Sequence, residues 1–91
     1  MKIKNGFELK EVADSFIAIP VMENVVDFSS VIMLNETAAF LWKILENEKT
    51  KKELVNELLG IYDVTEEVAV KDVEKLVEEL ANAGVLEGKI E

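Results

Sequence analysis

The chain has 91 residues, 49% of them hydrophobic, and its 19 acidic against 10 basic side chains give a formal net charge of −9. Every basic residue is lysine, and histidine, arginine and cysteine are absent. This composition excludes imidazole acid–base catalysis, guanidinium contacts to phosphate, disulfides and zinc–thiolate sites. A chain of this length has room for one hydrophobic core, so we expect a single domain over residues 1–91.

No segment of the sequence predicts export or membrane insertion. The first residues break at Asn5 and Gly6 before the apolar core of a signal peptide can form. The longest run of large apolar side chains covers residues 31–34, far short of the roughly 20 residues that span a bilayer. We therefore expect a soluble cytoplasmic protein with no membrane partner.

The first third of the chain has the alternating pattern of β-strands. Three segments show it: residues 6–14, 15–21 and 27–34, with a loop over residues 22–27. Phe7 and Leu9 share one face of the first segment. Pro20 is expected at the end of the second strand or where no ladder donor is needed. The pattern predicts a small antiparallel sheet of three strands.

From Asn35 onward the apolar residues recur at helical spacing. The predicted helices cover residues 36–46, 51 to about 61, and 66 to about 83, after the capping residues Asn35, Thr50 and Thr65. Glu53 completes a capping box with Thr50, and Gly84 is placed to end the third helix. A short extended segment is expected at residues 85–87. The order predicts an α+β winged helix-turn-helix, with a three-stranded antiparallel sheet followed by three helices.

The third predicted helix has an apolar face and a mixed flank. Its core face consists of Ala69, Val70, Val73, Leu76, Val77, Leu80 and Ala81. Val68 falls outside this face and shares a flank with Asp72, Lys75 and Glu79. Six acidic against two basic side chains on this helix would be repelled by phosphate, which argues against nucleic acid as a partner.

None of the usual catalytic patterns occurs in the chain. Paired carboxylates such as Glu66 with Glu67 arise by chance among so many acidic residues, and the scattered glycines form no phosphate-binding loop. The serines have no histidine to activate them. We predict a protein that is not an enzyme and that needs no cofactor or metal. Trp42 and Tyr62 are expected to pack in the core, with Trp42 between the first helix and the sheet.

The third predicted strand provides the candidate binding site. One face of residues 27–34 carries Phe28, Ser30, Ile32 and Leu34, and the other carries Asp27, Ser29, Val31 and Met33. Near its end both faces are apolar, so the third helix, another chain or a ligand must cover the extra face. An edge strand at this place could accept an extended peptide by strand addition. A central, buried strand explains the same pattern equally well.

Five segments together carry a family pattern: GFELKEVADSFIAIPV, DFSSVIMLNET, LNETAAFLWKILE, TKKELVNELLGIYDV and DVEKLVEELANAGVLE. In these segments, which cover nearly all of the chain, the sequence resembles the PqqD family. The resemblance implies a RiPP recognition element, a winged-helix domain that binds the leader segment of a ribosomally made precursor peptide. It further implies presentation of that peptide to a radical S-adenosylmethionine enzyme, as in pyrroloquinoline quinone biosynthesis or a related pathway.

The resemblance also implies where the leader binds, as a strand beside residues 27–34 and against the third helix. The residues expected to face it are Ser29, Val31, Met33, Val68, Lys71, Asp72, Lys75 and Leu76. Lys71 and Lys75 could pair with acidic leader residues, each exposed pair adding about 0–1 kcal/mol. A shift of one residue in strand register would swap the two faces. An exposed edge allows a monomer or a strand-exchanged dimer. The alternatives are an acidic winged-helix module for another protein contact and a transcription-related winged-helix domain.

Overall fold

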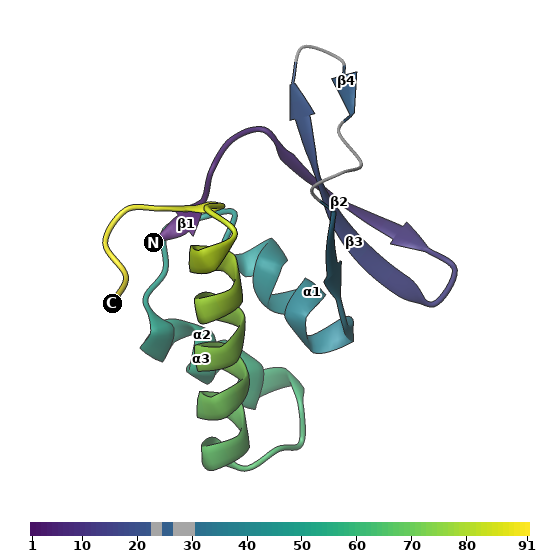
Figure 1. The fold of residues 1–91 in the computed structure, drawn as a ribbon. Helices are drawn as coiled ribbons and strands as arrows, with labels where there is room; N and C mark the ends of the chain where they lie inside the picture. Colours follow the sequence, from purple (N-terminus) through teal and green to yellow (C-terminus); the bar gives the residue numbers. More distant parts are fainter. Residues whose placement is uncertain (23–24, 27–30) are drawn as a thin grey trace.

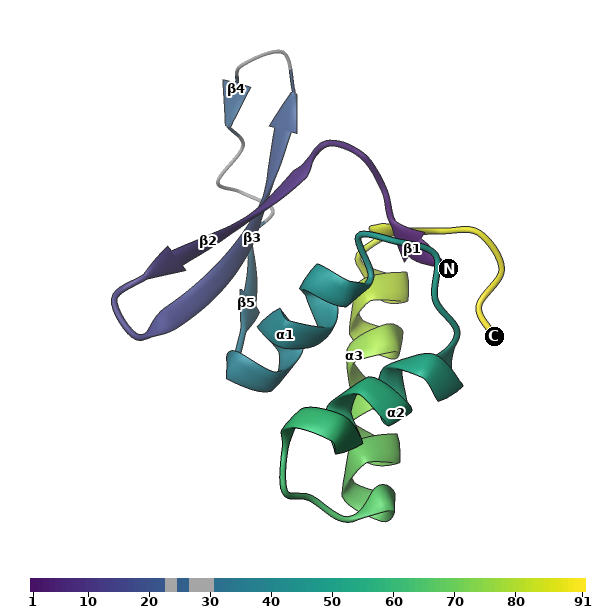
Figure 2. The same ribbon diagram turned by 180° about the vertical axis from the view of Figure 1, so that it is seen from behind.

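The computed structural model describes residues 1–22, 25–26 and 31–91 (Figure 1). The elements in chain order are β1 (Lys2–Ile3), β2 (Phe7–Val12), β3 (Ser15–Met22), β4 (Val25–Val26), β5 (Ile32–Leu34), α1 (Glu36–Ile44), α2 (Lys51–Ile61), α3 (Glu66–Asn82) and β6 (Leu86–Glu87). The view from behind shows α1 between the sheet and the other two helices (Figure 2). Three antiparallel strands and three helices confirm the predicted α+β winged-helix fold.

The sheet is built around β3. Strand β2 pairs with it on one side, in a register that sets Phe7 opposite Pro20. Strand β5 pairs with it on the other side, where Leu34 lies opposite Phe16. The short β4 also pairs with β3, with Val26 opposite Val21. Because β2 occupies one side of β3, β4 and β5 lie along the same opposite side.

Two predictions in the first third of the chain are corrected. The predicted loop over residues 22–27 is wrong at Met22, which ends β3, and at Val25–Val26, where two β-branched residues form β4. Of the predicted third strand, only Ile32–Leu34 is β5; Val31 precedes it, and residues 27–30 lie outside the described residues. Strand β3 also continues past Pro20 to Met22. The Val21 N–H donates to the Gly6 carbonyl oxygen at 2.6 Å, just before β2, and Val21 and Met22 pair with β4.

The ends of the described chain form a second, two-stranded ladder that the sequence did not predict. Lys2 pairs with Glu87 and Ile3 with Leu86, so β1 and β6 are antiparallel partners. The expected extended segment at residues 85–87 is present as β6. Its partner was missed because a strand of two residues is too short to show alternation. The ladder places the side chain of Ile3 in the core.

Each helix begins at the capping residue that the sequence predicted. The Thr50 Oγ1 accepts from the Glu53 N–H at 3.1 Å, and the Glu53 Oε1 accepts from the Thr50 N–H at 3.0 Å. This reciprocal pair is the predicted capping box. Asn35 and Thr65 accept backbone N–H groups at the starts of α1 and α3 in the same way. The caps fix where α1 and α3 begin relative to the sheet.

The C-terminal end of α3 is a Schellman motif. The Val85 N–H donates to the Leu80 carbonyl oxygen and the Gly84 N–H to that of Ala81, each at 3.1 Å. Gly84 has a φ of +75°, a left-handed conformation that favours glycine. Leu80 and Val85 are both buried, which supplies the apolar contact of this motif. The turn sends the chain from α3 back to β6.

The core lies between the helices and the sheet. Its largest fully buried side chains are Trp42, Leu41, Leu45, Leu54, Leu58, Leu80, Val73 and Val85. The Trp42 ring makes an edge contact with Phe7 of β2 at 6.3 Å between centroids, so Trp42 packs between α1 and the sheet as predicted. The predicted core face of α3 is buried apart from Val70, which is half-buried, and Ala81, which is exposed.

Candidate functional site

Strand β5 lies at an edge of the sheet. It pairs with β3 on one side, and within the described residues no strand pairs with its other side. The side chain of Leu34 is buried, whereas Met33 is 68% exposed. Because successive side chains of a strand point to opposite faces, Met33 lies on the outward face. The unpaired backbone groups along the outer edge of β5 are available to another extended segment.

A groove lies between β5, the first two turns of α1, and α3. It has a volume of about 240 Å³ and is lined by Met33, Leu34, Asn35, Thr37, Ala38, Leu41, Asp72, Lys75, Leu76 and Glu79. We call it the β5–α3 groove. Its apolar part comes from the buried side chains of Leu34, Leu41 and Leu76. The charged residues that line it are exposed, so the groove combines an apolar floor with a charged rim.

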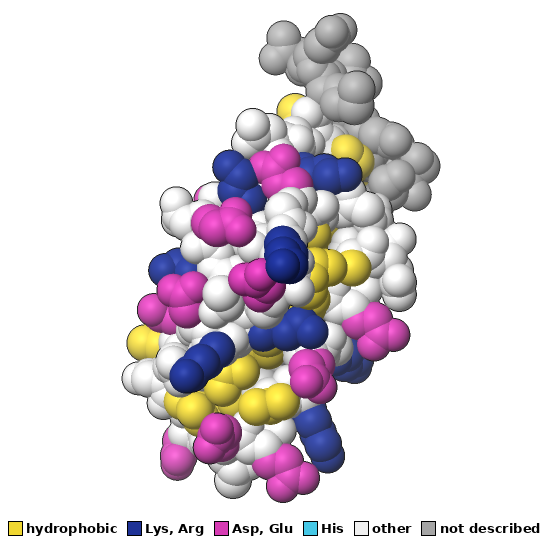
Figure 3. Space-filling view, turned by 90° about the vertical axis from the view of Figure 1, so that its left-hand side faces the viewer, with side chains coloured by type: hydrophobic (Ala, Val, Ile, Leu, Met, Phe, Trp, Pro, Cys, Tyr) yellow, Lys and Arg dark blue, Asp and Glu magenta, His cyan; other side chains and the backbone are white. Residues whose placement is uncertain are grey.

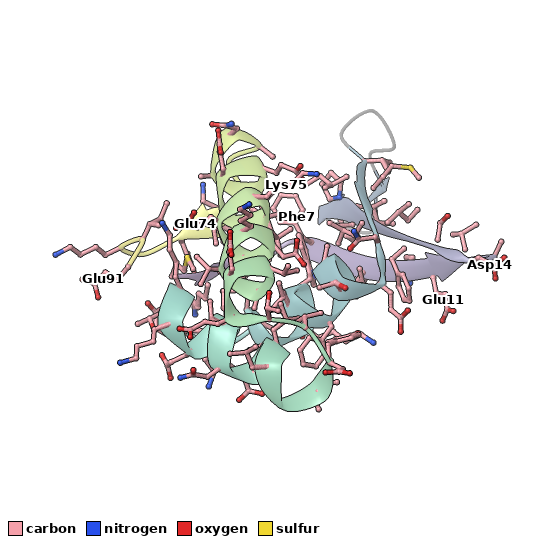
Figure 4. All side chains as sticks on the ribbon, turned by 90° about the horizontal axis from the view of Figure 1, so that it is seen from below. Phe7, Glu11, Asp14, Glu74, Lys75 and Glu91 are labelled. Carbon is pink, nitrogen blue, oxygen red and sulfur yellow. The ribbon has the colours of Figure 1, made fainter. Side chains whose placement is uncertain are left out.

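Helix periodicity explains how α3 forms one wall of this groove. Three lining residues follow Asp72 by three, four and seven positions: Lys75, Leu76 and Glu79. At this spacing all four share one stripe of the helix. Lys75 extends from α3 towards the sheet, and Glu74 lies on the other side of the helix (Figure 4). The stripe therefore carries polar groups at the rim and one leucine at the border of the core.

Comparison with known proteins identifies the family. The family model for PqqD, described as coenzyme PQQ synthesis protein D, matches residues 23–86. The chain belongs to the PqqD family. No curated protein matches the chain.

Two solved structures share the fold of this PqqD-family domain. One is TbiB1 in complex with the TbiA(beta) leader peptide, with a TM-score of 0.73 and 22% identity over 100% of both chains. The other is lasso peptide synthetase B1 complexed with the leader peptide. It has a TM-score of 0.67 and 18% identity over 92% of this chain and 93% of that chain. At these identities the likeness establishes a common fold.

The groove brings together half of the site residues that the sequence predicted for the PqqD-family domain. Met33, Asp72, Lys75 and Leu76 all line it. Val68 lies one helical turn before Asp72 and is 43% exposed, but it does not line the groove. Lys71 also lies outside it.

The remaining predicted residues lie elsewhere. The Lys71 Nζ lies 3.7 Å from the Glu67 Oε1, one turn earlier on α3. Val31 is half-buried just before β5, and Ser29 lies outside the described residues.

The contribution of α1 to the groove was missed. Asn35, Thr37, Ala38 and Leu41 line the groove, although the sequence pattern indicated only a cap and a core stripe. A signal was present, because a single residue separates the end of β5 from the start of α1. Such a short connection forces the first turn of the helix to lie beside the strand. Glu79 was placed on the correct flank but was not predicted as a site residue.

A second, larger hollow lies on the opposite edge of the sheet. It has a volume of about 600 Å³ and is lined by residues 3–10, by Trp42 and Lys43 of α1, and by Glu46 just after this helix. Strand β2, which borders it, carries Glu8, Lys10 and Glu11 among its six residues. The Lys10 Nζ lies 3.1 Å from the Glu8 Oε2. Charged side chains on an edge strand discourage pairing with another strand, so this edge is the weaker candidate.

The described surface offers little to a metal ion or to nucleic acid. Within the described residues, no group of three or more acidic side chains is arranged to hold a metal. Acidic and lysine side chains are interspersed on the face that Figure 3 shows, without the continuous basic patch of a nucleic-acid-binding surface. In the described part of the chain, no helix is both long and apolar enough to cross a membrane.

Proposed function

We propose that this PqqD-family protein binds the leader segment of a ribosomally made precursor peptide in the β5–α3 groove. The leader would add to the outer edge of β5 as an antiparallel or parallel strand and contact α3 with alternate side chains. The observation that carries the proposal is an edge strand, unpaired on its outer side within the described residues, beside a groove walled by a helix. It is supported by the two proteins of the same fold, both of which are complexes with leader peptides.

The size and chemistry of the groove suit a peptide better than a small metabolite. Pockets for drug-sized ligands usually measure about 300–1,000 Å³. The β5–α3 groove, at about 240 Å³, is smaller and is lined by Met33 and Leu34 of the edge strand β5. It therefore suits one or two anchoring side chains from a longer extended chain. Ladder hydrogen bonds would position the peptide backbone, and the buried leucines of the floor would select an apolar anchor.

We further propose that this protein presents its peptide and that a partner enzyme performs the chemistry. The chain lacks histidine, arginine and cysteine, so it has few groups suited to acid–base, redox or nucleophilic steps. The partner would be a radical S-adenosylmethionine maturase acting in the cytoplasm, with pyrroloquinoline quinone biosynthesis as one candidate pathway. The same free edge also permits a strand-exchanged dimer, in which a second copy replaces the leader.

Calorimetric titration tests the binding step. The purified protein is titrated with the synthetic leader of a precursor peptide encoded beside its gene, and with a scrambled peptide of the same composition as the control. We expect saturable binding of the leader with a Kd of about 1 μM or tighter, equivalent to about −8 kcal/mol, and no binding of the scrambled peptide. Equal binding of both peptides, or binding of neither by folded protein, would contradict the proposal.

The presentation step has its own test. The neighbouring maturase is assayed on the full precursor with and without this protein. We expect modification to depend on the protein and to be lost when free leader is added in excess, because the free leader competes for the groove. Equal modification without the protein would show that presentation is not its role.

A further inference from the structure

The rim of the β5–α3 groove carries more negative than positive charge. Asp72 and Glu79 contribute carboxylates, and Lys75 contributes the one ammonium group among the lining residues. At 1.5 Å of rise per residue, Lys75 lies about 4.5 Å along the axis from Asp72 and about 6 Å from Glu79. In the described part of the structure, none of the three has an ion-pair partner within 4.0 Å. Their charges are thus available to a bound peptide.

Among the described residues, the other elements around the groove do not offset this excess. Strand β5, the Asn35 cap and the first two turns of α1 line it with uncharged residues, which are Met33, Leu34, Asn35, Thr37, Ala38 and Leu41. The neighbouring Lys71 lies outside the groove and pairs with Glu67. The groove therefore has a formal charge of −1, obtained from two carboxylates and one ammonium group, within a chain of net charge −9.

An extended peptide would meet the floor and the rim with side chains on the same face. Residues two apart in a strand point to the same side and are separated by about 6.6–6.8 Å. An apolar side chain over Leu34, Leu41 and Leu76 would therefore place the side chain two residues away near the charged stripe of α3. A long lysine or arginine side chain can reach either carboxylate from there, whereas an acidic side chain meets two like charges.

We propose that the groove selects a cationic leader segment, in which an apolar anchor stands two residues from a lysine or arginine. This inference rests on the proposed function and goes beyond it by naming the charge of the peptide. It differs from the sequence-based expectation that Lys71 and Lys75 pair with acidic leader residues. The difference arises because Lys71 is outside the groove and Lys75 is outnumbered there by Asp72 and Glu79.

Two short probes test the charge preference without knowledge of the precursor. They are the blocked peptides acetyl-Leu-Thr-Lys-Thr-Leu-Thr-Lys-amide and acetyl-Leu-Thr-Glu-Thr-Leu-Thr-Glu-amide, followed by heteronuclear NMR at equal ionic strength. The lysine peptide should shift the signals of Ile32–Leu34 and of the α3 stripe with a Kd at least about fivefold lower than the glutamate peptide, since each exposed pair contributes modestly. Equal or reversed affinities would overturn the proposal.

Matched variants separate the groove from the general negative charge of the protein. Asp72→Asn with Glu79→Gln removes two charges from the rim, and Glu74→Gln with Glu78→Gln removes two from residues of α3 that do not line the groove. All four residues are exposed, so both variants should fold. The rim variant should lose the preference for lysine, and the control should keep it. An equal loss in both would show a non-specific effect of net charge.

The authentic leader provides a second test if the short probes bind too weakly. The leader of the precursor encoded beside the gene should bind the rim variant at least about fivefold more weakly than the wild type, and the control variant within about twofold. Unchanged or tighter binding to the rim variant would overturn the charge preference while leaving leader binding intact. Absence of leader binding to the wild type would instead contradict the proposed function.

Discussion

The two edges of the sheet differ in ways that indicate their roles. Strand β5 has the uncharged sequence Ile32–Leu34 and faces the wall of α3 across a small groove. Strand β2 carries three charged residues among six and borders a wider hollow beside α1. Charge on one edge protects the sheet against unwanted pairing. The other edge lacks this protection, which is the arrangement expected of a surface that must accept a strand.

The support behind the two edges also differs. The floor of the β5–α3 groove consists of leucines that are almost completely buried, at 5% exposed for Leu34, 1% for Leu41 and 4% for Leu76. The wall is held by the Thr65 cap at one end of α3 and by the Gly84 turn at the other. A groove fixed in this way is formed before the peptide arrives, so less binding energy is lost to ordering.

The largest expected effect comes from filling each hollow in turn. Thr37→Trp places a bulky side chain at the β5–α3 groove. Lys43→Trp places the same side chain on the same helix, at the larger hollow bordered by β2. We expect Thr37→Trp to weaken leader binding at least about tenfold, or about 1.4 kcal/mol, because it occupies the anchor space. Lys43→Trp should change it less than about twofold. Calorimetric titration measures both, and a reversed result would exchange the roles of the edges.

The next effect concerns the stability of the α3 wall. Gly84→Ala should lower the free energy of unfolding by about 1–2 kcal/mol, because alanine is strained in the left-handed conformation. Gly60, inside α2, has no atom within 4 Å of an added Cβ. Gly60→Ala should therefore raise stability by about 0.5–1 kcal/mol. Urea denaturation of the two variants gives both values, and a loss in each would show that the cap geometry is not the cause.

A smaller effect is expected from trimming one exposed apolar side chain at each edge. Met33 on β5 is 68% exposed and Val12 on β2 is 55% exposed. Met33→Ala should weaken leader binding by about fivefold, near 1 kcal/mol, because alanine covers less apolar surface of the peptide than methionine does. Val12→Ala should leave binding unchanged in the same calorimetric titration. Equal effects of the two substitutions would mean that the leader does not lie along β5.

The smallest effect concerns the charges that protect β2. Glu8→Val with Lys10→Val removes the ion pair from this edge, and Glu67→Val with Lys71→Val removes an equivalent pair from α3. Stability should change by less than about 1 kcal/mol in both, since exposed ion pairs contribute little. The β2 variant alone should self-associate as its concentration rises in analytical ultracentrifugation. A monomeric β2 variant would show that those charges do not protect the edge.

The sequence predicted the parts of the fold that depend on neighbouring residues. The caps at Thr50 and Thr65 and the turn at Gly84 were located correctly, because each is determined within a few positions of the chain. The β1–β6 ladder was missed, because it joins residues from the two ends through strands of two residues. Strand β4 was also missed, because it too has only two residues.

The candidate site was predicted where a single element determines it. Helix periodicity placed Asp72 and Lys75 on the mixed flank of α3 and Leu76 on the adjoining core face, and all three line the groove. The residues that α1 contributes to the groove depend on how this helix packs against β5, and helix periodicity does not predict that packing. The position of Lys71 also shows the limit of that approach. It lies one turn before Lys75 on the same side of the helix, but it is outside the part of α3 that lines the groove and pairs with Glu67.

A leader titration followed by heteronuclear NMR tests the central claim, that the open edge is β5, most directly. The account predicts saturable shifts at Ile32–Leu34 and along the stripe from Asp72 to Glu79, with the signals of Phe7–Val12 almost unchanged. Shifts concentrated on Phe7–Val12 and on the side of α1 that carries Lys43 would place the peptide at the opposite edge and contradict it.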